Sequence, residues 1–187
     1  EMEFIAGRSL QQLINDEGQL TIPRALSLAA RTADGLAAAH RDDIIHRDVK
    51  PDNIMLTKRG DPKISDFGLA KRVLNSKGKP VAEEICGTPN YMAPELFQGK
   101  EASPASDVYA LGVTLYLALT GRLPYQAKSL QQLRWKGRNE LIPNVRRVRS
   151  DVPLEVAECV SMMTAPAPGN RPKNAIEASQ LLHAVLG

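Results

Sequence analysis

The chain has 187 residues, of which 43% are hydrophobic and 24% are charged, and its formal net charge is +3. This length and apolar content suffice for one domain with a hydrophobic core, and the small net charge does not argue for nucleic-acid binding. The two cysteines, Cys86 and Cys159, lie far apart, which excludes a disulfide framework and fits a reducing, cytoplasmic compartment. The longest apolar run, Val108 to Thr120, would span only ~20 Å as a helix, too short for a bilayer core of ~30 Å.

The first elements of the chain are predicted to be a strand end and two helices. Residues 1–5 are half apolar and precede an Ala-Gly pair, a pattern typical of a strand that runs into a turn. Ser9 is expected to begin a short helix that Gly18 ends. Thr21, with Pro23 two residues later, predicts the N-terminal end of a longer helix.

Apolar side chains recur at three-to-four spacing from Leu26 to His40, so the longer helix is expected to bury one face. A polar segment follows it. Residues 54–56 and 62–65 then predict two short strands joined by a turn. Residues 69–92 have few periodic apolar positions, so we expect them to form a long loop.

From Pro94 onward the sequence predicts helices separated by short connections. Asn174, three residues before Glu177, resembles a capping box for the last of these helices. The predicted fold class is therefore α+β, a mainly helical domain with a small β-hairpin in its first half. Helices are expected over residues 104–120, 127–137, 153–164 and 174–186.

Three polar motifs carry the chemistry of this sequence. In chain order they read His46-Arg47-Asp48-Val49-Lys50-Pro51-Asp52-Asn53, then Asp66-Phe67-Gly68, then Ala93-Pro94-Glu95. In order and spacing they resemble the catalytic loop, the metal-binding triplet and the end of the activation segment of the protein kinase family. Coincidence is the alternative, and three motifs in the right order make it negligible. The resemblance covers nearly the whole chain and implies a partial kinase domain over residues 1–187, namely the hinge and the C-terminal lobe.

Four side chains in these motifs have the chemistry that phosphoryl transfer needs, an oriented nucleophile and neutralised charge. Asp48 is an acceptor-only carboxylate, suited to orient a substrate hydroxyl and to receive its proton as the catalytic base. Lys50 brings positive charge close to the transferred phosphate. Asn53 and Asp66 offer hard oxygen ligands for Mg²⁺, with Mn²⁺ as an alternative metal.

The resemblance also indicates the substrate class. In the family, a lysine two residues after the catalytic aspartate, here Lys50, marks serine/threonine kinases. Thr88, in a Gly-Thr-Pro sequence, would hydrogen-bond Asp48 and Lys50 and shape the pocket for the residue after the target hydroxyl.

A regulatory hypothesis follows from the position three residues before the glycine of that Gly-Thr pair. Many kinases carry a phosphorylated residue there, which docks on the catalytic-loop arginine and orders the activation loop. Here the position is Glu84, and Arg47 and Lys71 match the basic residues of the docking pocket. Glu84 would then supply a permanent negative charge. The alternative is that Glu83 and Glu84 are a solvated acidic pair without this role.

The resemblance assigns the nucleotide site as well. Residues 1–5 resemble the hinge between the two kinase lobes, where Glu3 and Ile5 would offer backbone groups to adenine. Met55 would lie under the adenine ring. The residues expected to contact ATP are Glu3, Ile5, Lys50, Asn53, Met55 and Asp66.

Other positions are expected to be structural. His46 and Phe67 are predicted to pack against each other, and Asp107 resembles the family's buried aspartate that hydrogen-bonds the catalytic-loop backbone. Glu95 and Arg171 resemble a buried ion pair that ties the activation segment to the last helices. Three further residues, His40, His183 and Trp135, are interpreted as helix-face or packing residues without function. The basic run at residues 146–149 is interpreted as a solvated surface turn in preference to an interaction patch.

The sequence therefore predicts a protein serine/threonine kinase that uses ATP and Mg²⁺ and acts on serine and threonine hydroxyls of protein substrates, with no nucleic-acid partner and no membrane segment. The alternative is a kinase relic that binds proteins without catalysis. No GxGxxG loop, V-A-I-K-type lysine or partner glutamate is found in the sequence. We therefore expect the chain to lack the N-terminal lobe and, by itself, to be inactive.

Overall fold

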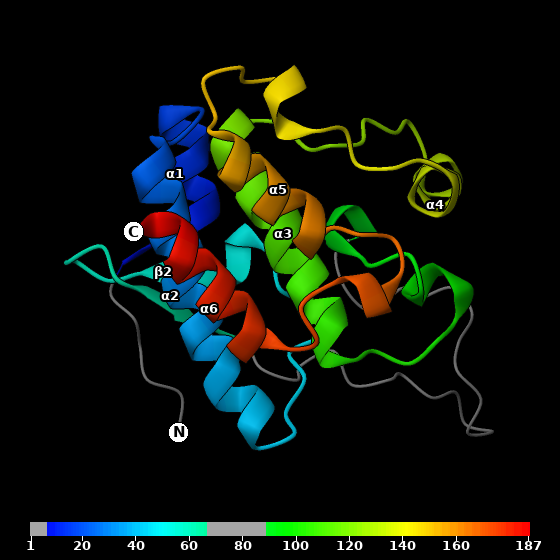
Figure 1. Ribbon diagram of the computed structural model, residues 1–187, viewed down its shortest axis with the longest axis horizontal. Helices are drawn as coiled ribbons and strands as arrows, with labels where there is room; N and C mark the ends of the chain where they lie inside the picture. The colour runs from blue at the N-terminus through cyan, green and yellow to red at the C-terminus, as the bar shows by residue number, and fades with distance from the viewer. Residues whose placement is uncertain (1–6, 67–88) are drawn as a thin grey trace.

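The computed structural model describes residues 7–66 and 89–187, and the predicted strand end at residues 1–5 lies outside this part (Figure 1). Most of the predicted loop at 69–92 lies outside it as well. The described residues form a mainly helical α+β domain with one small antiparallel sheet, which confirms the predicted fold class.

Helices α1 (Leu10–Glu17) and α2 (Ile22–Arg41) begin where the sequence predicted them to begin. Ser9 caps α1 in a complete capping box: its hydroxyl accepts the Gln12 N–H at 3.2 Å, and the Gln12 side chain accepts the Ser9 N–H at 2.9 Å. Thr21 occupies the N-cap position of α2, but its side chain makes no capping hydrogen bond. The fixed backbone of Pro23 in the first turn therefore contributes more to this helix start than the threonine hydroxyl.

The sheet contains the predicted hairpin and one further strand. Strands β2 (Ile54–Leu56) and β3 (Pro62–Ile64) pair antiparallel, with Ile54 opposite Ile64. Strand β1 (Arg8–Ser9) pairs with the other edge of β2, so the order is β1-β2-β3. The sheet thus places the end of the 46–53 loop and the start of the segment after β3 next to each other.

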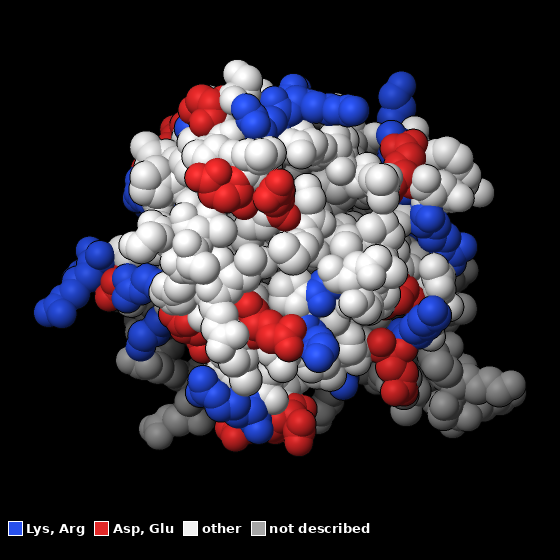
Figure 2. Space-filling model, viewed as in Figure 1, with Lys and Arg blue, Asp and Glu red and all other residues white. Residues whose placement is uncertain are grey.

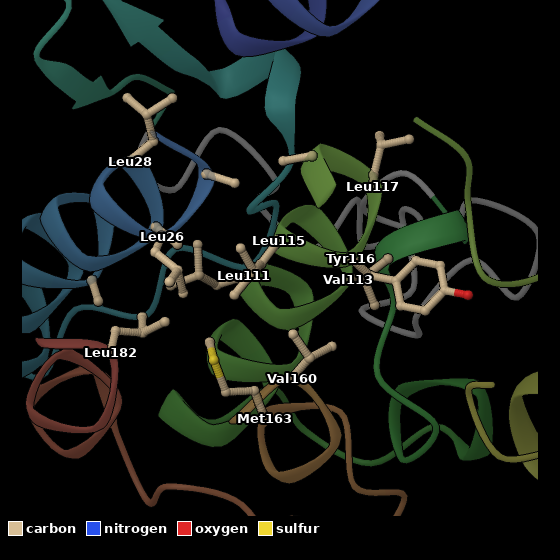
Figure 3. Packing of buried hydrophobic residues seen from close by; sticks show 14 of the residues in the cluster. Leu26, Leu28, Leu111, Val113, Leu115, Tyr116, Leu117, Val160, Met163 and Leu182 are labelled. Carbon is tan, nitrogen blue, oxygen red and sulfur yellow. The ribbon is translucent and has the colours of Figure 1, made fainter. Parts of the chain in front are cut away.

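Helix α3 (Pro104–Thr120) is the centre of the core and is buried over nearly its whole length. Gly112 permits the close approach of α5 (Leu154–Met163), because a Cβ there would lie 2.9 Å from Met163 Cβ and 2.7 Å from Cγ2 of Thr164, the residue after the helix. Gly121 ends α3 in the left-handed region, with φ of 70°. Figure 3 shows side chains of α3 interleaved with those of its neighbours, including Leu26, Leu111, Leu115, Val160, Met163 and Leu182.

The last helix, α6 (Ala175–Leu186), lies along α2 (Figure 1). Asn174 caps it by accepting the N–H groups of Ile176 and Glu177. The Glu177 carboxylate, however, accepts the N–H of Lys173 and not that of Asn174, so the predicted capping box is only half formed. In the described part of the chain, no helix combines the length and the apolar character that a membrane span requires.

Helix α4 (Leu130–Asn139) begins three residues later than predicted and lies at the edge of the domain opposite α1 (Figure 1). Trp135 on this helix is 58% exposed, so its interpretation as a packing residue was wrong. The basic run at 146–149 is only partly solvated. The Arg149 guanidinium donates to the carbonyls of Leu20 at 2.6 Å and Leu119 at 3.0 Å, and so ties three segments together.

Candidate active site

The candidate site lies where the 46–53 loop meets the end of the hairpin. The loop joins α2 to β2 and ends in a 3-10 turn, Pro51–Asn53. Asp66 comes two residues after β3. Because β2 and β3 pair antiparallel, the start of β2 and the end of β3 lie at the same edge of the sheet. This arrangement brings the first two sequence motifs together.

Asp48 lies between a cation and an amide. Its Oδ2 is 2.9 Å from Lys50 Nζ and accepts a hydrogen bond from Asn53 Nδ2 at 3.0 Å. Asn53 Nδ2 also donates to the Asp48 carbonyl at 2.8 Å. Both N–H donors of the Asn53 amide are therefore used on Asp48, which fixes the orientation of the amide and leaves its Oδ1 as the atom for another partner.

Ser65 joins Asn53 to Asp66. The Ser65 backbone N–H donates to the Asn53 carbonyl at 2.9 Å, and its hydroxyl lies 3.1 Å from Asp66 Oδ2. A continuous series of hydrogen bonds thus runs from the Asp48 carboxylate through Asn53 and Ser65 to the Asp66 carboxylate. Sequence reasoning did not single out Ser65, since its role depends on pairing between separate strands.

Two residues at the site, Asp66 itself and Arg47 next to Asp48, have unusual backbone conformations. Arg47 has φ of 71° and Asp66 has φ of 62°, both in the left-handed region that non-glycine residues seldom adopt. Such residues cost on the order of 1–3 kcal/mol each, and they cluster at functional sites where the surroundings hold them. Here the Arg47 N–H is held by Asp107 Oδ1 at 2.9 Å.

His46 connects the loop to the segment after β3. It is fully buried, its Nδ1 accepts the Asp48 N–H at 3.2 Å, and its Nε2 lies 2.8 Å from the Ser65 carbonyl. Because Nδ1 accepts, Nε2 carries the proton and donates it to Ser65. His46 is therefore a buried positioning residue. Its expected partner Phe67 lies outside the described residues.

Asp107 on α3 holds the backbone of the 46–53 loop. Its carboxylate accepts the N–H groups of His46 at 2.8 Å and Arg47 at 2.9 Å, which is the contact expected from the resemblance. A third donor is His40, whose Nε2 lies 3.0 Å from Asp107 Oδ2. His40 Nδ1 accepts the Ala175 N–H at 3.0 Å, so Nε2 carries the proton.

This contact corrects the interpretation of His40 as a helix-face residue without function. It is buried, and it links α2, Asp107 of α3 and the first turn of α6. Its partners lie 67 and 135 residues away in the chain, and a helical pattern alone cannot indicate contacts at that distance.

Glu95 and Arg171 form a bidentate ion pair, with both N–O distances at 2.8 Å. The Arg171 guanidinium also lies over the Tyr109 ring, 4.8 Å from its centroid. Burial acts to raise the pKa of Glu95, but the hydrogen bonds and positive charge of Arg171 outweigh it and hold this pKa below its ordinary value. Ser106 Oγ donates a further hydrogen bond to Glu95 at 2.9 Å.

A pocket is lined by Asp48, Arg47, Tyr91 and Met92, among others, so Asp48 and the segment before Glu95 border the same cavity. Burial, reinforced by the negative charge of Asp52, raises the pKa of Tyr91. Other predicted site residues lie outside the described part of the chain, and their roles stay predictions: Glu3, Ile5, Phe67, Lys71, Glu84 and Thr88.

The donor set at Asn53 and Asp66 fits Mg²⁺. Among the residues that the structure describes, no three His, Cys, Asp or Glu side chains gather into a metal cage. Mg²⁺ does not require one, since in nucleotide sites it binds one or two carboxylates together with phosphate oxygens and waters. The Asp66 carboxylate and Asn53 Oδ1 are hard oxygen donors on adjoining segments, which is the chemistry that such an ion prefers.

Comparison with known proteins matches residues 1–185 to the protein kinase domain. The chain is 38% identical over 189 residues to the serine/threonine-protein kinase PknK of Mycobacterium tuberculosis, covering 98% of this chain and 16% of that protein. It is 35% identical to PknL of the same organism, covering 98% of this chain and 46% of that protein. It is 34% identical to PrkC of Bacillus subtilis, covering 91% and 26%. The chain thus spans less than half the length of these relatives.

Proposed function

Because the chain belongs to the protein kinase family, as the match over residues 1–185 shows, we propose that its protein transfers the γ-phosphoryl group of ATP to serine and threonine hydroxyls of proteins. The observation that carries the proposal is the hydrogen-bonded series that joins the Asp48 and Asp66 carboxylates through Asn53 and Ser65. Curated relatives are named serine/threonine-protein kinases, which supports the same class of acceptor.

Asp48 acts as the base in this proposal. Its carboxylate accepts a hydrogen bond from the substrate hydroxyl and takes up the proton as the oxygen bonds to the γ-phosphorus and ADP leaves. Lys50, 2.9 Å from Asp48, places positive charge beside the transferred group. Asn53 holds the Asp48 side chain through its amide, so that the carboxylate keeps one orientation.

Asn53 Oδ1 and the Asp66 carboxylate would hold Mg²⁺, or Mn²⁺ with the same kind of donors. The bound ion would neutralise charge on the β- and γ-phosphates. Met55, half-buried on β2, is proposed to face the adenine ring. We further propose that residues 1–187 are the hinge and C-terminal lobe of a kinase domain, and that the protein works in the cytoplasm.

The test is phosphate incorporation into a serine-containing protein by the full-length protein. Asp48→Asn is expected to lower the rate by about 10²–10⁴-fold, the usual contribution of a positioned base. Asp42→Asn is the matched control, because Asp42 is an exposed carboxylate at the end of α2, outside the site. Equal rates for the wild type and both variants would refute the catalytic role and leave the alternative of a non-catalytic binding module.

We also retain the proposal that Glu84 replaces a phosphorylated residue. Its support is the sequence position of Glu84 together with Arg47 and Lys71. Glu84→Lys is expected to lower the activity of the full-length protein, because the positive charge of lysine would be repelled by Arg47 and Lys71. Unchanged activity in both Glu84→Lys and Glu84→Thr would remove the idea.

A further inference from the structure

A groove of about 380 Å³ lies away from the candidate active site, between the segment after α4 and the C-terminal end of α5. This volume falls within the ~300–1,000 Å³ that is usual for ligand sites in proteins. One wall is formed by Leu141, Ile142 and Pro143, and the other by Ala165 and Pro166, while Arg147 contributes the charged group.

The walls present apolar surface to solvent. Leu141 is 72% exposed, the largest exposed fraction among the exposed large hydrophobic residues of the described chain. A single exposed leucine is ordinary, but this one heads an apolar wall that faces a second apolar wall. Pro143 and Pro166 have no backbone N–H, so recognition in this groove relies on side-chain packing more than on backbone hydrogen bonds.

The charge in the groove is unbalanced. Within residues 7–66 and 89–187, the Arg147 side chain forms no ion pair and donates no hydrogen bond. By contrast, Arg149 is paired with Asp151, and Glu140, beside the apolar wall, is paired with Lys136 at 3.3 Å. Arg147 therefore favours a partner that brings its own carboxylate.

Both walls are fixed without a partner. The carbonyls of Ala165 and Pro166 accept hydrogen bonds from the buried Arg171 guanidinium at 2.6 and 2.8 Å. The opposite wall leads into the 3-10 turn Val145–Arg147, which buried Val145 anchors in the core. A groove that is already rigid loses little conformational entropy on binding, which favours affinity.

We propose that this groove binds a short acidic and apolar segment of a partner protein, with its apolar side chains between the Leu141 and Pro166 walls and its carboxylate on Arg147. The proposal goes beyond the phosphoryl-transfer function, since binding here requires neither ATP nor Asp48. The Pro166 wall of the groove accepts a hydrogen bond from the same Arg171 guanidinium that pairs with Glu95.

The test uses fluorescence anisotropy with the full-length protein and two labelled heptapeptides, Gly-Leu-Pro-Leu-Glu-Glu-Gly and its counterpart with lysine in place of glutamate. Arg147→Glu is expected to weaken binding of the acidic peptide about fivefold, the upper range for an exposed ion pair, and to strengthen binding of the lysine peptide. Arg146→Glu is the matched control, because it makes the same charge change one residue away, outside the groove lining. We expect it to change affinity less than twofold.

A steric variant tests the apolar part of the proposal. Ser161 is exposed and lines the groove, and its hydroxyl donates a hydrogen bond to the Ala157 carbonyl of its own helix. Ser161→Trp is expected to fill the groove and reduce binding of the acidic peptide at least tenfold while the helical circular dichroism is kept. Unchanged binding in this variant, equal affinity of the wild type for both peptides, or equal effects of Arg146→Glu and Arg147→Glu would each overturn the proposal. A wild-type dimer in analytical ultracentrifugation that becomes a monomer in Arg147→Glu would also overturn the proposal, because a second copy of the chain would then occupy the groove.

Discussion

Replacing Arg171 by methionine is expected to destabilise the domain by about 3–5 kcal/mol, the usual cost of removing one partner of a buried ion pair. The Arg171 side chain is 0% exposed and that of Glu95 is 6% exposed, so water does not compensate either charge. All five N–H donors of the guanidinium are used. They bond to both Glu95 carboxylate oxygens and to the carbonyls of Ala105, Ala165 and Pro166.

Two further variants separate the causes. Arg171→Lys keeps the charge, but an ammonium group has only three donors and lacks the planar geometry of a guanidinium. We therefore expect this variant to be more stable than Arg171→Met but less stable than the wild type. Replacing Glu95 and Arg171 together by methionine removes both charges, and it is expected to recover part of the loss of the single variant.

The assay is hydrogen exchange of α3 amides in the full-length protein, because α3 is buried and its amides exchange through opening of the whole domain. A loss of about 4 kcal/mol corresponds to roughly a thousandfold faster exchange. The Glu95 pKa lies below its reference value of 4.5, so the pair's stabilisation is present above that pH and is lost as the pH falls through the lowered folded value. Exchange within fivefold of wild type in Arg171→Met would refute the reasoning.

Three other predictions concern separate parts of the fold. His40→Leu removes a buried donor and is expected to lower kcat and to speed hydrogen exchange of the 46–53 loop, whereas equal exchange would contradict the positioning role. Gly112→Ala is expected to cost about 1–3 kcal/mol in thermal unfolding because its Cβ would overlap α5, while Gly169→Ala, with no atom within 4 Å, should cost much less. Burial acts to raise the pKa of Asp34. Hydrogen bonds from Ser179 and His183 outweigh this effect and hold the pKa of Asp34 below 3.8. Their stabilisation is present above that pH and is lost as the pH falls further, so acid unfolding curves of wild type and Asp34→Asn should converge at low pH.

Local patterns predicted most of the elements. The capping residue Ser9 and the terminating residue Gly121 fix helix ends through contacts within a few residues, so the sequence shows them directly. The resemblance to the kinase motifs likewise implied that Asp48, Asn53 and Asp66 share one site, and the short hairpin between Asn53 and Asp66 brings them together. The helix ends depend on neighbouring residues alone, whereas the approach of Asn53 to Asp66 also requires that the two strands of the hairpin pair.

Contacts between distant segments were not predictable in this way. His40 carries the same helical spacing as its apolar neighbours, and only the packing of α2 against α3 and α6 gives it polar partners. Arg149 was interpreted as part of a solvated run from its basic neighbours alone. Its carbonyl partners, Leu20 and Leu119, are far away in the sequence, so the pattern could not reveal them. Trp135 was expected to pack, yet α4 lies at the edge of the domain and leaves it exposed. The mixture of acidic and basic side chains on the face in Figure 2 agrees with the small net charge.

The measurement that tests the central claim most directly is the single-turnover rate of phosphoryl transfer at saturating MgATP, compared with ATP affinity, in full-length wild-type protein and Asp48→Asn. A carboxylate that only receives the hydroxyl proton should affect the chemical step alone. We therefore predict a rate about 10²–10⁴-fold lower with ATP affinity unchanged within about twofold. An unchanged rate, or a parallel loss of rate and affinity, would contradict the account of Asp48 as the base beside the Asn53 and Asp66 ligands.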